Sequence, residues 1–284
     1  MATQPDGRED PGSGSLSGFF VFTFAVSWTF FIGVAVWSWR VDAATAARWS
    51  GVLTLPGVLA PALVAIALAA RAGGEDGVRR LLARLFRWNV PAWTWVFALG
   101  YMGAIKLLAA VVHRLALGVW PVFGAEPWYL MIAATVFSFL VFGQAGEEVG
   151  WRGWALPRMG TRMGLGWASV VLGVIWAVWH LPLFWLRTAD KAGQSFPLYL
   201  VQVTALSVVV AWLWWRTGGS LTLTMLLHAA VNNTKDIVPS ATPGATQVFG
   251  LGASRVGWIT VGLLWLCAIG FLIDMRRARN LGTD

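Results

Sequence analysis

The sequence predicts an all-α protein, a polytopic transmembrane helix bundle of about eight spans, from three observations. First, 57% of its 284 residues are hydrophobic and only 12% are charged, whereas soluble domains carry about 25% charged residues. Second, the chain contains apolar runs long enough to cross a hydrocarbon core of ~30 Å as helices. Third, most of the excess positive charge, +8 in all, lies in short segments between these runs. This distribution is typical of membrane topology and does not indicate nucleic-acid binding.

The elements follow in order along the chain. Residues 1–16 are polar and rich in Gly, Ser and Asp, which predicts a disordered tail before a single transmembrane domain at 17–284. The expected spans are residues 17–39, 50–70, 90–112, 128–156, 165–186, 198–215, 221–238 and 257–273. They use the whole chain, so no separate soluble domain is expected. The single cysteine, Cys267, excludes an intrachain disulfide.

Basic residues predict the orientation of these spans. Residues 77–88 alternate arginines with apolar residues at helical spacing, which predicts an interfacial helix on anionic lipid. An even number of spans places both termini on one side, and that side holds most of the arginines. The positive-inside rule therefore predicts that both termini are cytoplasmic. We expect an integral membrane protein of a prokaryotic cell membrane.

A few polar residues lie inside the apolar runs, where ionisable groups are costly and usually face a cavity or one another. Glu147 and Glu148 form an adjacent pair, and His180 and His228 lie in two later spans. Asn232 follows His228 by four residues and therefore shares its helix face. Each of these His and Asn side chains alone could simply hydrogen-bond a neighbouring helix. Together with an unpaired carboxylate, they offer a base, donors and metal ligands, which predicts a functional site.

The two glutamates have different expected roles because adjacent helical residues point about 100° apart. Glu148 and Arg152 are spaced i, i+4 in the order that favours an ion pair, and we expect this pair to be mainly structural. Glu147 has no local partner and would suit proton transfer. It lies beside four glycines that allow another helix to approach closely: Gly143, Gly146, Gly150 and Gly153. Pro182 is expected to bend or end the fifth span just after His180.

Three motifs resemble those of the CPBP family of intramembrane proteases, which includes the type II CAAX prenyl endopeptidases and the Abi proteins. Residues 147–152 read EEVGWR and match the family's EExxxR motif. Residues 176–180 read WAVWH and resemble FxxxH, and residues 228–232 read HAAVN and match HxxxN. Order and spacing agree over a motif-bearing core at 128–233. Trp176 replaces the usual Phe, at what we expect to be a packing position.

The resemblance implies hydrolysis of a peptide bond in a water-accessible cavity within the membrane. It implies that Glu147 and His180 activate a water molecule, and that His228 and Asn232 bind the developing oxyanion. A poised base and preorganised donors are each worth several orders of magnitude in rate. Two supporting residues would orient the site: Glu148 and Arg152.

An alternative interpretation of the same family makes three of these residues metal ligands. Glu147, His180 and His228 would form a workable site for zinc or another divalent metal. The chain has no HExxH motif, and Asn is a poor zinc ligand, so the cofactor-free mechanism is slightly favoured.

The expected partners are the lipid bilayer and a membrane-associated peptide or protein, and no nucleic acid. The sequence does not select between prenylated and other peptides, and it leaves the oligomeric state open. The competing hypothesis is a non-catalytic membrane scaffold, an immunity protein or a transporter that uses the same polar cluster. Transporters often consist of two repeated halves with broken spans in corresponding positions. The first three spans contain no polar residues that correspond to the cluster in the later spans. This difference favours the enzyme.

Overall fold

A computed structural model describes residues 15–141, 143–240 and 247–281, and all of the regular structure in these residues is helical. The prediction of an all-α transmembrane bundle is confirmed. Six described helices are long and apolar enough to cross a membrane, or seven if one bent pair counts as a single span. This number agrees roughly with the expected eight. Nearly all of the tail predicted at 1–16 lies outside the described residues.

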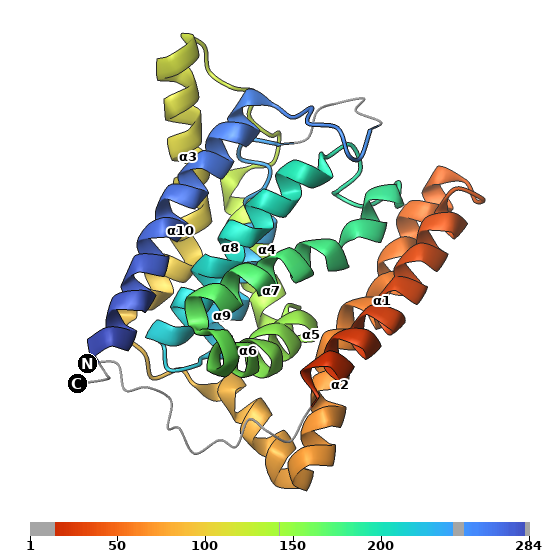
Figure 1. Cartoon of the computed structure of the whole chain (residues 1–284). Helices are drawn as coiled ribbons and strands as arrows, with labels where there is room; N and C mark the ends of the chain where they lie inside the picture. The colour runs from red at the N-terminus through yellow and green to blue at the C-terminus, as the bar shows by residue number, and fades with distance from the viewer. Residues whose placement is uncertain (1–14, 142, 241–246, 282–284) are drawn as a thin grey trace.

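The first two helices form a hairpin along one edge of the bundle (Figure 1). Helix α1 (Leu16–Ser38) starts at a cap in which the Ser15 side chain accepts a hydrogen bond from the backbone N–H of Gly18. Helix α2 (Ala43–Ala83) begins after a short turn. The Ser27 hydroxyl donates to the Gly57 carbonyl across the pair (2.7 Å) and fixes its register.

Helix α2 is broken at Gly73 and Gly74, where the backbone leaves the helical region. The second limb of α2 and the 3₁₀ turn η2 (Arg84–Phe86) correspond to the interfacial helix predicted at 77–88. One part of that prediction is wrong, because the side chain of Arg84 is buried and does not face lipid. It donates to the carbonyl of Gly153 (3.2 Å) and so ties this limb to the region around the glutamates.

The remaining long helices enclose a buried centre. Helix α3 (Ala92–Leu117) and helix α10 (Arg255–Leu281) pack together on the edge opposite the hairpin (Figure 1). Helix α8 (Phe196–Arg216) lies between α10 and α7 (Leu165–Trp179). Helix α9 (Leu221–Asn233) is almost fully buried beside α8. At 13 residues it is shorter than its predicted span and too short to cross a bilayer alone.

The span predicted at 128–156 is not one helix, which corrects the expectation of a continuous span. Helix α4 (Trp128–Leu140) ends near the glycine-rich segment, and a second limb follows at a bend of 51°. This limb consists of α5 (Ala145–Glu148), the π-helical segment η3 (Val149–Ala155) and α6 (Leu156–Met163). The break places both glutamates in the first turn after it. π-helical turns are rare and frequently occur at functional sites.

The glycine face of this second limb packs on α2, as the sequence predicts. A Cβ atom at Gly150 would lie 2.6 Å from backbone atoms of Pro61, and one at Gly146 would lie 2.9 Å from the Val58 carbonyl oxygen. Only glycine permits this approach, because real Cβ contacts are not that short. The close packing fixes the second limb, and hence the glutamates, against the hairpin.

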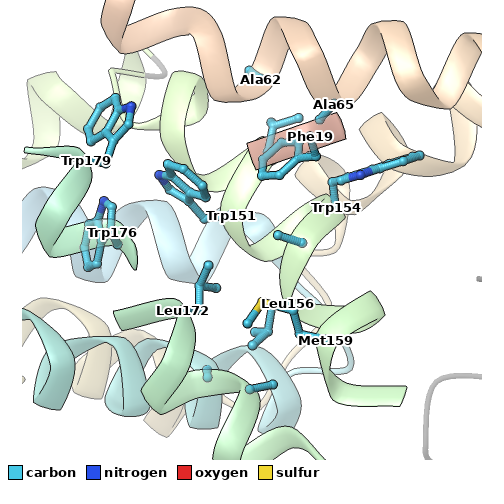
Figure 2. Close-up of a cluster of buried hydrophobic side chains, with 14 of the residues drawn as sticks. Phe19, Ala62, Ala65, Trp151, Trp154, Leu156, Met159, Leu172, Trp176 and Trp179 are labelled. Atoms are coloured by element: carbon cyan, nitrogen blue, oxygen red, sulfur yellow. The ribbon is translucent and has the colours of Figure 1, made fainter. Parts of the chain in front are cut away.

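Buried tryptophans fill the space around the second limb. Figure 2 shows Trp151, Trp154, Trp176 and Trp179 in one cluster, which also includes Phe19 of α1. Trp179 is the last residue of α7, and the chain then turns into the 3₁₀ segment η4 (Leu181–Trp185). The prediction that the fifth helix ends near Pro182 is confirmed. His180 therefore lies at the end of α7, with its direction set by the packed tryptophans.

Candidate active site

The predicted site residues line one cavity of about 640 Å³. Glu147 reaches it from α5, His180 from the end of α7, and His228 and Asn232 from α9. Glu147 and Asn232 are 85 positions apart in the sequence, and the fold brings all four residues to one cavity. The expectation that His228 and Asn232 share a helix face is confirmed, because both line the cavity.

Two contacts of the Glu147 carboxylate come from the α7 region. Its Oε2 atom accepts a hydrogen bond from the indole N–H of Trp176 (2.7 Å). The same oxygen lies 4.0 Å from Nε2 of His180. The expectation that Glu147 is unpaired is therefore wrong, because its partner comes from a helix distant in sequence. The side chain is largely buried yet reaches the cavity.

The orientation of His180 follows from its other ring nitrogen. Nδ1 lies 2.8 Å from the backbone carbonyl oxygen of Trp176, which can only accept a hydrogen bond. This contact assigns the hydrogen to Nδ1, so in the neutral ring Nε2 presents a lone pair toward Glu147. The 4.0 Å separation from Glu147 is too long for a direct hydrogen bond.

Glu148 is at the centre of a buried polar network. Its Oε1 atom accepts from Nη1 of Arg152 (2.9 Å) and from Nδ1 of His228 (3.0 Å). The predicted Glu148–Arg152 ion pair is confirmed, and both side chains are fully buried. The bond to His228 crosses between helices and could not be read from the spacing. Glu148 thereby fixes the His228 ring while Arg152 balances its charge.

Trp176 contacts four residues of the site. Its indole N–H donates to Glu147, and its backbone carbonyl accepts from His180. Its ring lies 4.2 Å from the guanidinium carbon of Arg152 and packs edge-to-face on His228 at 5.2 Å. The expectation that Trp176 only packs is therefore wrong. The signal in the sequence was the tryptophan itself, because a phenylalanine at this position has no N–H to donate.

The geometry does not fit the alternative set of metal ligands. Within the described ranges, no three His, Cys, Asp or Glu side chains are grouped closely enough to hold a metal ion. Glu147 approaches His180, whereas His228 is bonded through Nδ1 to the other glutamate. No step is therefore assigned to a metal.

The cavity is also lined by charged groups that the sequence did not assign to a site. Asp190 pairs with Lys191 through Oδ1 (3.0 Å) and with Lys235 through Oδ2 (3.0 Å). Partial burial alone would raise the pKa of the Asp190 carboxyl, but the two lysines outweigh it and hold this pKa below its usual range. Lys106 is buried nearby and donates to the Val238 carbonyl (2.8 Å). Tyr199 lies between this end and the His180 ring.

Comparisons with known proteins agree with this geometry. The family model described as Rce1-like, type II CAAX prenyl endopeptidase, matches residues 127–234. A protein of Methanococcus maripaludis named CAAX prenyl protease 2 is 23% identical over 230 residues, which cover 74% of this chain and 82% of that protein. These matches confirm the CPBP resemblance. The matched segment contains α4 to α9 and the predicted site residues Glu147, His180, His228 and Asn232.

Proposed function

We propose that this protein is an intramembrane endopeptidase that hydrolyses a peptide bond in a membrane-associated peptide or protein. The observation that carries the proposal is the pairing of Glu147 with Nε2 of His180 at 4.0 Å, in a cavity that His228 and Asn232 also line. One water molecule held between the carboxylate and the ring nitrogen would bridge this distance with a hydrogen bond to each. We further propose that the protein lies in a prokaryotic cell membrane with both termini in the cytoplasm.

In the proposed reaction, this water attacks the carbonyl carbon of the substrate. Glu147 takes one proton from the water as the new C–O bond forms, with His180 orienting the attacking oxygen. The resulting tetrahedral intermediate collapses when the C–N bond breaks and the proton passes to the leaving amine. The products are a carboxylic acid and an amine, so atoms and charge balance without a cofactor. The absence of a grouped ligand set among the described residues supports this metal-free route.

The negative charge that develops on the substrate carbonyl oxygen needs donors. Asn232 can donate through its side-chain amide, and His228 through Nε2 when this ring is protonated, because Nδ1 is occupied by Glu148. The buried network of Glu148 and Arg152 would hold the His228 ring in place before the substrate arrives. Such preorganisation typically lowers a barrier by about 3–4 kcal/mol for one donor.

The test is cleavage of membrane-tethered peptides by purified protein, with Glu147→Gln as the decisive variant and Glu126→Gln as the matched control in an exposed loop. The pool includes prenylated and unprenylated peptides, since the Methanococcus relative is named as a CAAX prenyl protease. Loss of cleavage in Glu147→Gln only, with activity retained in a chelator, supports the proposal. Cleavage by Glu147→Gln at the wild-type rate refutes the role of Glu147. Loss of wild-type activity in chelator refutes the metal-free route.

A non-catalytic scaffold, an immunity protein or a transporter with the same polar cluster is the second candidate. Folded wild-type protein that cleaves no peptide of the pool would favour this candidate over the enzyme.

A further inference from the structure

A second cavity, of about 570 Å³, lies between the start of α7 and the last part of α10. It is called the α7–α10 cavity below. Among the described residues, it shares no lining residue with the cavity of Glu147. Helix α7 connects the two, because its first turn lines the α7–α10 cavity whereas Trp176 and Trp179 at its other end line the first. An inference about the α7–α10 cavity therefore does not depend on the proposed reaction.

The walls of the α7–α10 cavity are mostly apolar and belong to two helices that are long and apolar enough to cross a membrane. The two helices approach closely at one point, where a Cβ atom at Gly166 would lie 3.4 Å from Cδ2 of Leu272. Trp167 is 70% exposed at the rim, and exposed tryptophans are typical of the membrane interface. The other apolar lining residues include Leu165, Val170 and Met275. A groove of this kind is suited to an acyl chain.

One charged residue, Arg276, is found among the described residues that line the α7–α10 cavity. Its side chain is exposed, and no hydrogen bond or ion pair joins it to another described residue. The nearby acid on α10, Asp274, is engaged elsewhere: it accepts from the indole N–H of Trp212 (2.8 Å) and lies 3.9 Å from Nη1 of Arg216. The guanidinium of Arg276 is therefore available to an anion at the mouth of the cavity.

The surroundings of Arg276 add to the positive potential. Arg162 ends α6 directly before the lining residue Met163, and Arg277 follows Arg276 on α10. The first turn of α7 has no side-chain cap, so its backbone N–H groups add partial positive charge on the opposite wall. No acidic residue is among the described residues that line the cavity. An apolar groove with a positive mouth complements a molecule that has both an acyl chain and a net negative headgroup.

We propose that the α7–α10 cavity binds an anionic phospholipid, with its phosphate on Arg276 and an acyl chain along Trp167, Val170 and Leu272. Basic pockets between membrane-spanning helices bind anionic lipid headgroups in this way. A zwitterionic lipid fits less well, because its own cation lies close to the arginines. The lipid fills the space between α7 and α10 and binds independently of any peptide.

The test is lipid binding to the purified full-length protein in neutral detergent, measured by native mass spectrometry. Phosphatidylglycerol is compared with phosphatidylcholine that carries the same acyl chains. We expect the first phosphatidylglycerol to bind about fivefold more tightly, the ratio that one arginine near a membrane surface provides. In Arg276→Gln the two lipids should bind within about twofold of each other. Equal binding to the wild type, or a preference that survives Arg276→Gln, overturns the proposal.

Arg277→Gln is the matched control. It removes the same charge from the next residue of α10, which is also exposed but does not line the cavity. The preference for phosphatidylglycerol should persist in this variant. If Arg277→Gln abolishes the preference as completely as Arg276→Gln does, the lipid responds only to the general charge of this surface, and the proposal is wrong.

Two further measurements test the acyl chain. Val170→Phe fills the groove and should weaken phosphatidylglycerol binding at least fivefold, whereas Val171→Phe, at the next residue of α7 and outside the cavity lining, should not. Thermal unfolding first confirms that both variants are folded. Glycerol 3-phosphate carries the anion without the chains and should not displace the lipid at millimolar concentration. Displacement by glycerol 3-phosphate, or equal effects of the two phenylalanine variants, would show that the cavity does not hold a lipid chain.

Discussion

Replacing Trp176 with Phe should lower kcat strongly while leaving KM nearly unchanged. The substitution keeps an aromatic ring against Arg152 and His228 but removes the N–H that donates to Glu147 at 2.7 Å. A hydrogen bond to a charged acceptor contributes about 1.5–3 kcal/mol. If Glu147 is held in its working position by this bond, the loss corresponds to roughly 10- to 150-fold in kcat. The assay is steady-state cleavage of a membrane-tethered peptide, after a thermal unfolding measurement has shown that the variant is folded.

Trp179→Phe is the matched control for this prediction. Trp179 is as buried as Trp176 and belongs to the same cluster (Figure 2). It also packs against His180, at 4.7 Å between ring centres, but its indole N–H has no acceptor among the described residues. Both substitutions remove the same atoms, so the difference in kcat between them isolates the bond to Glu147. Equal losses in the two variants would mean that only ring volume matters and would refute the reasoning.

Three further predictions concern stability, each measured by unfolding in the same detergent. Gly150→Ala should lower the free energy of unfolding by about 1–3 kcal/mol, because the added methyl group overpacks against α2. Gly100→Ala is the control: nothing lies within 4 Å of the added Cβ, so this substitution should be neutral or stabilising. Equal effects of the two substitutions would contradict the close packing. Arg152→Met should lower the free energy of unfolding by about 3–5 kcal/mol, because it leaves Glu148 buried without its cation. Adding Glu148→Gln to this variant should recover part of the loss. Strictly additive effects of the two substitutions would contradict a coupled pair. The folded structure lowers the pKa of Asp190, so the ionised carboxylate stabilises the fold at pH values above about 4, the pKa of an aspartate in the unfolded chain. This stabilisation is lost progressively as the pH falls below about 4. Asp190→Asn should therefore lower Tm at pH 7 and differ progressively less from wild type below about pH 4, and a difference that grows in acid would be inconsistent with this sign.

Most of the fold could be predicted because a bilayer leaves few choices. In the hydrocarbon core of a membrane, the backbone N–H and C=O groups must form hydrogen bonds with one another, and a helix satisfies them all. Each long apolar run therefore predicts a helix. The break in the span at 128–156 could not be predicted, since hydropathy carries no information on bends. The packing of Gly150 against Pro61 involves residues far apart in sequence and decides where this limb runs. Only the tertiary structure shows it.

The sequence predicted which residues form the site, but it did not predict the hydrogen bonds that connect them. Placing an ionisable group inside a membrane costs free energy, so such groups within apolar runs are expected to be functional. This argument predicted Glu147, His180 and His228 as site residues. Periodicity within one helix gave the Glu148–Arg152 pair, confirmed at 2.9 Å. Bonds between helices have no signal in a single sequence. The contact of Glu148 with a histidine on α9 was therefore missed.

The two adjacent glutamates on one helical turn have different environments. Glu148 points into the protein, where Arg152 and His228 supply donors to the same oxygen and exclude water from it. Glu147 points to the cavity and receives a single N–H from Trp176, which leaves the rest of its carboxylate able to accept a proton. The Trp176 ring contacts both groups, because its N–H donates to Glu147 and its face covers the guanidinium of Arg152, the partner of Glu148. A fixed charge network and an accessible base can therefore occupy neighbouring positions, because adjacent helical residues point in different directions.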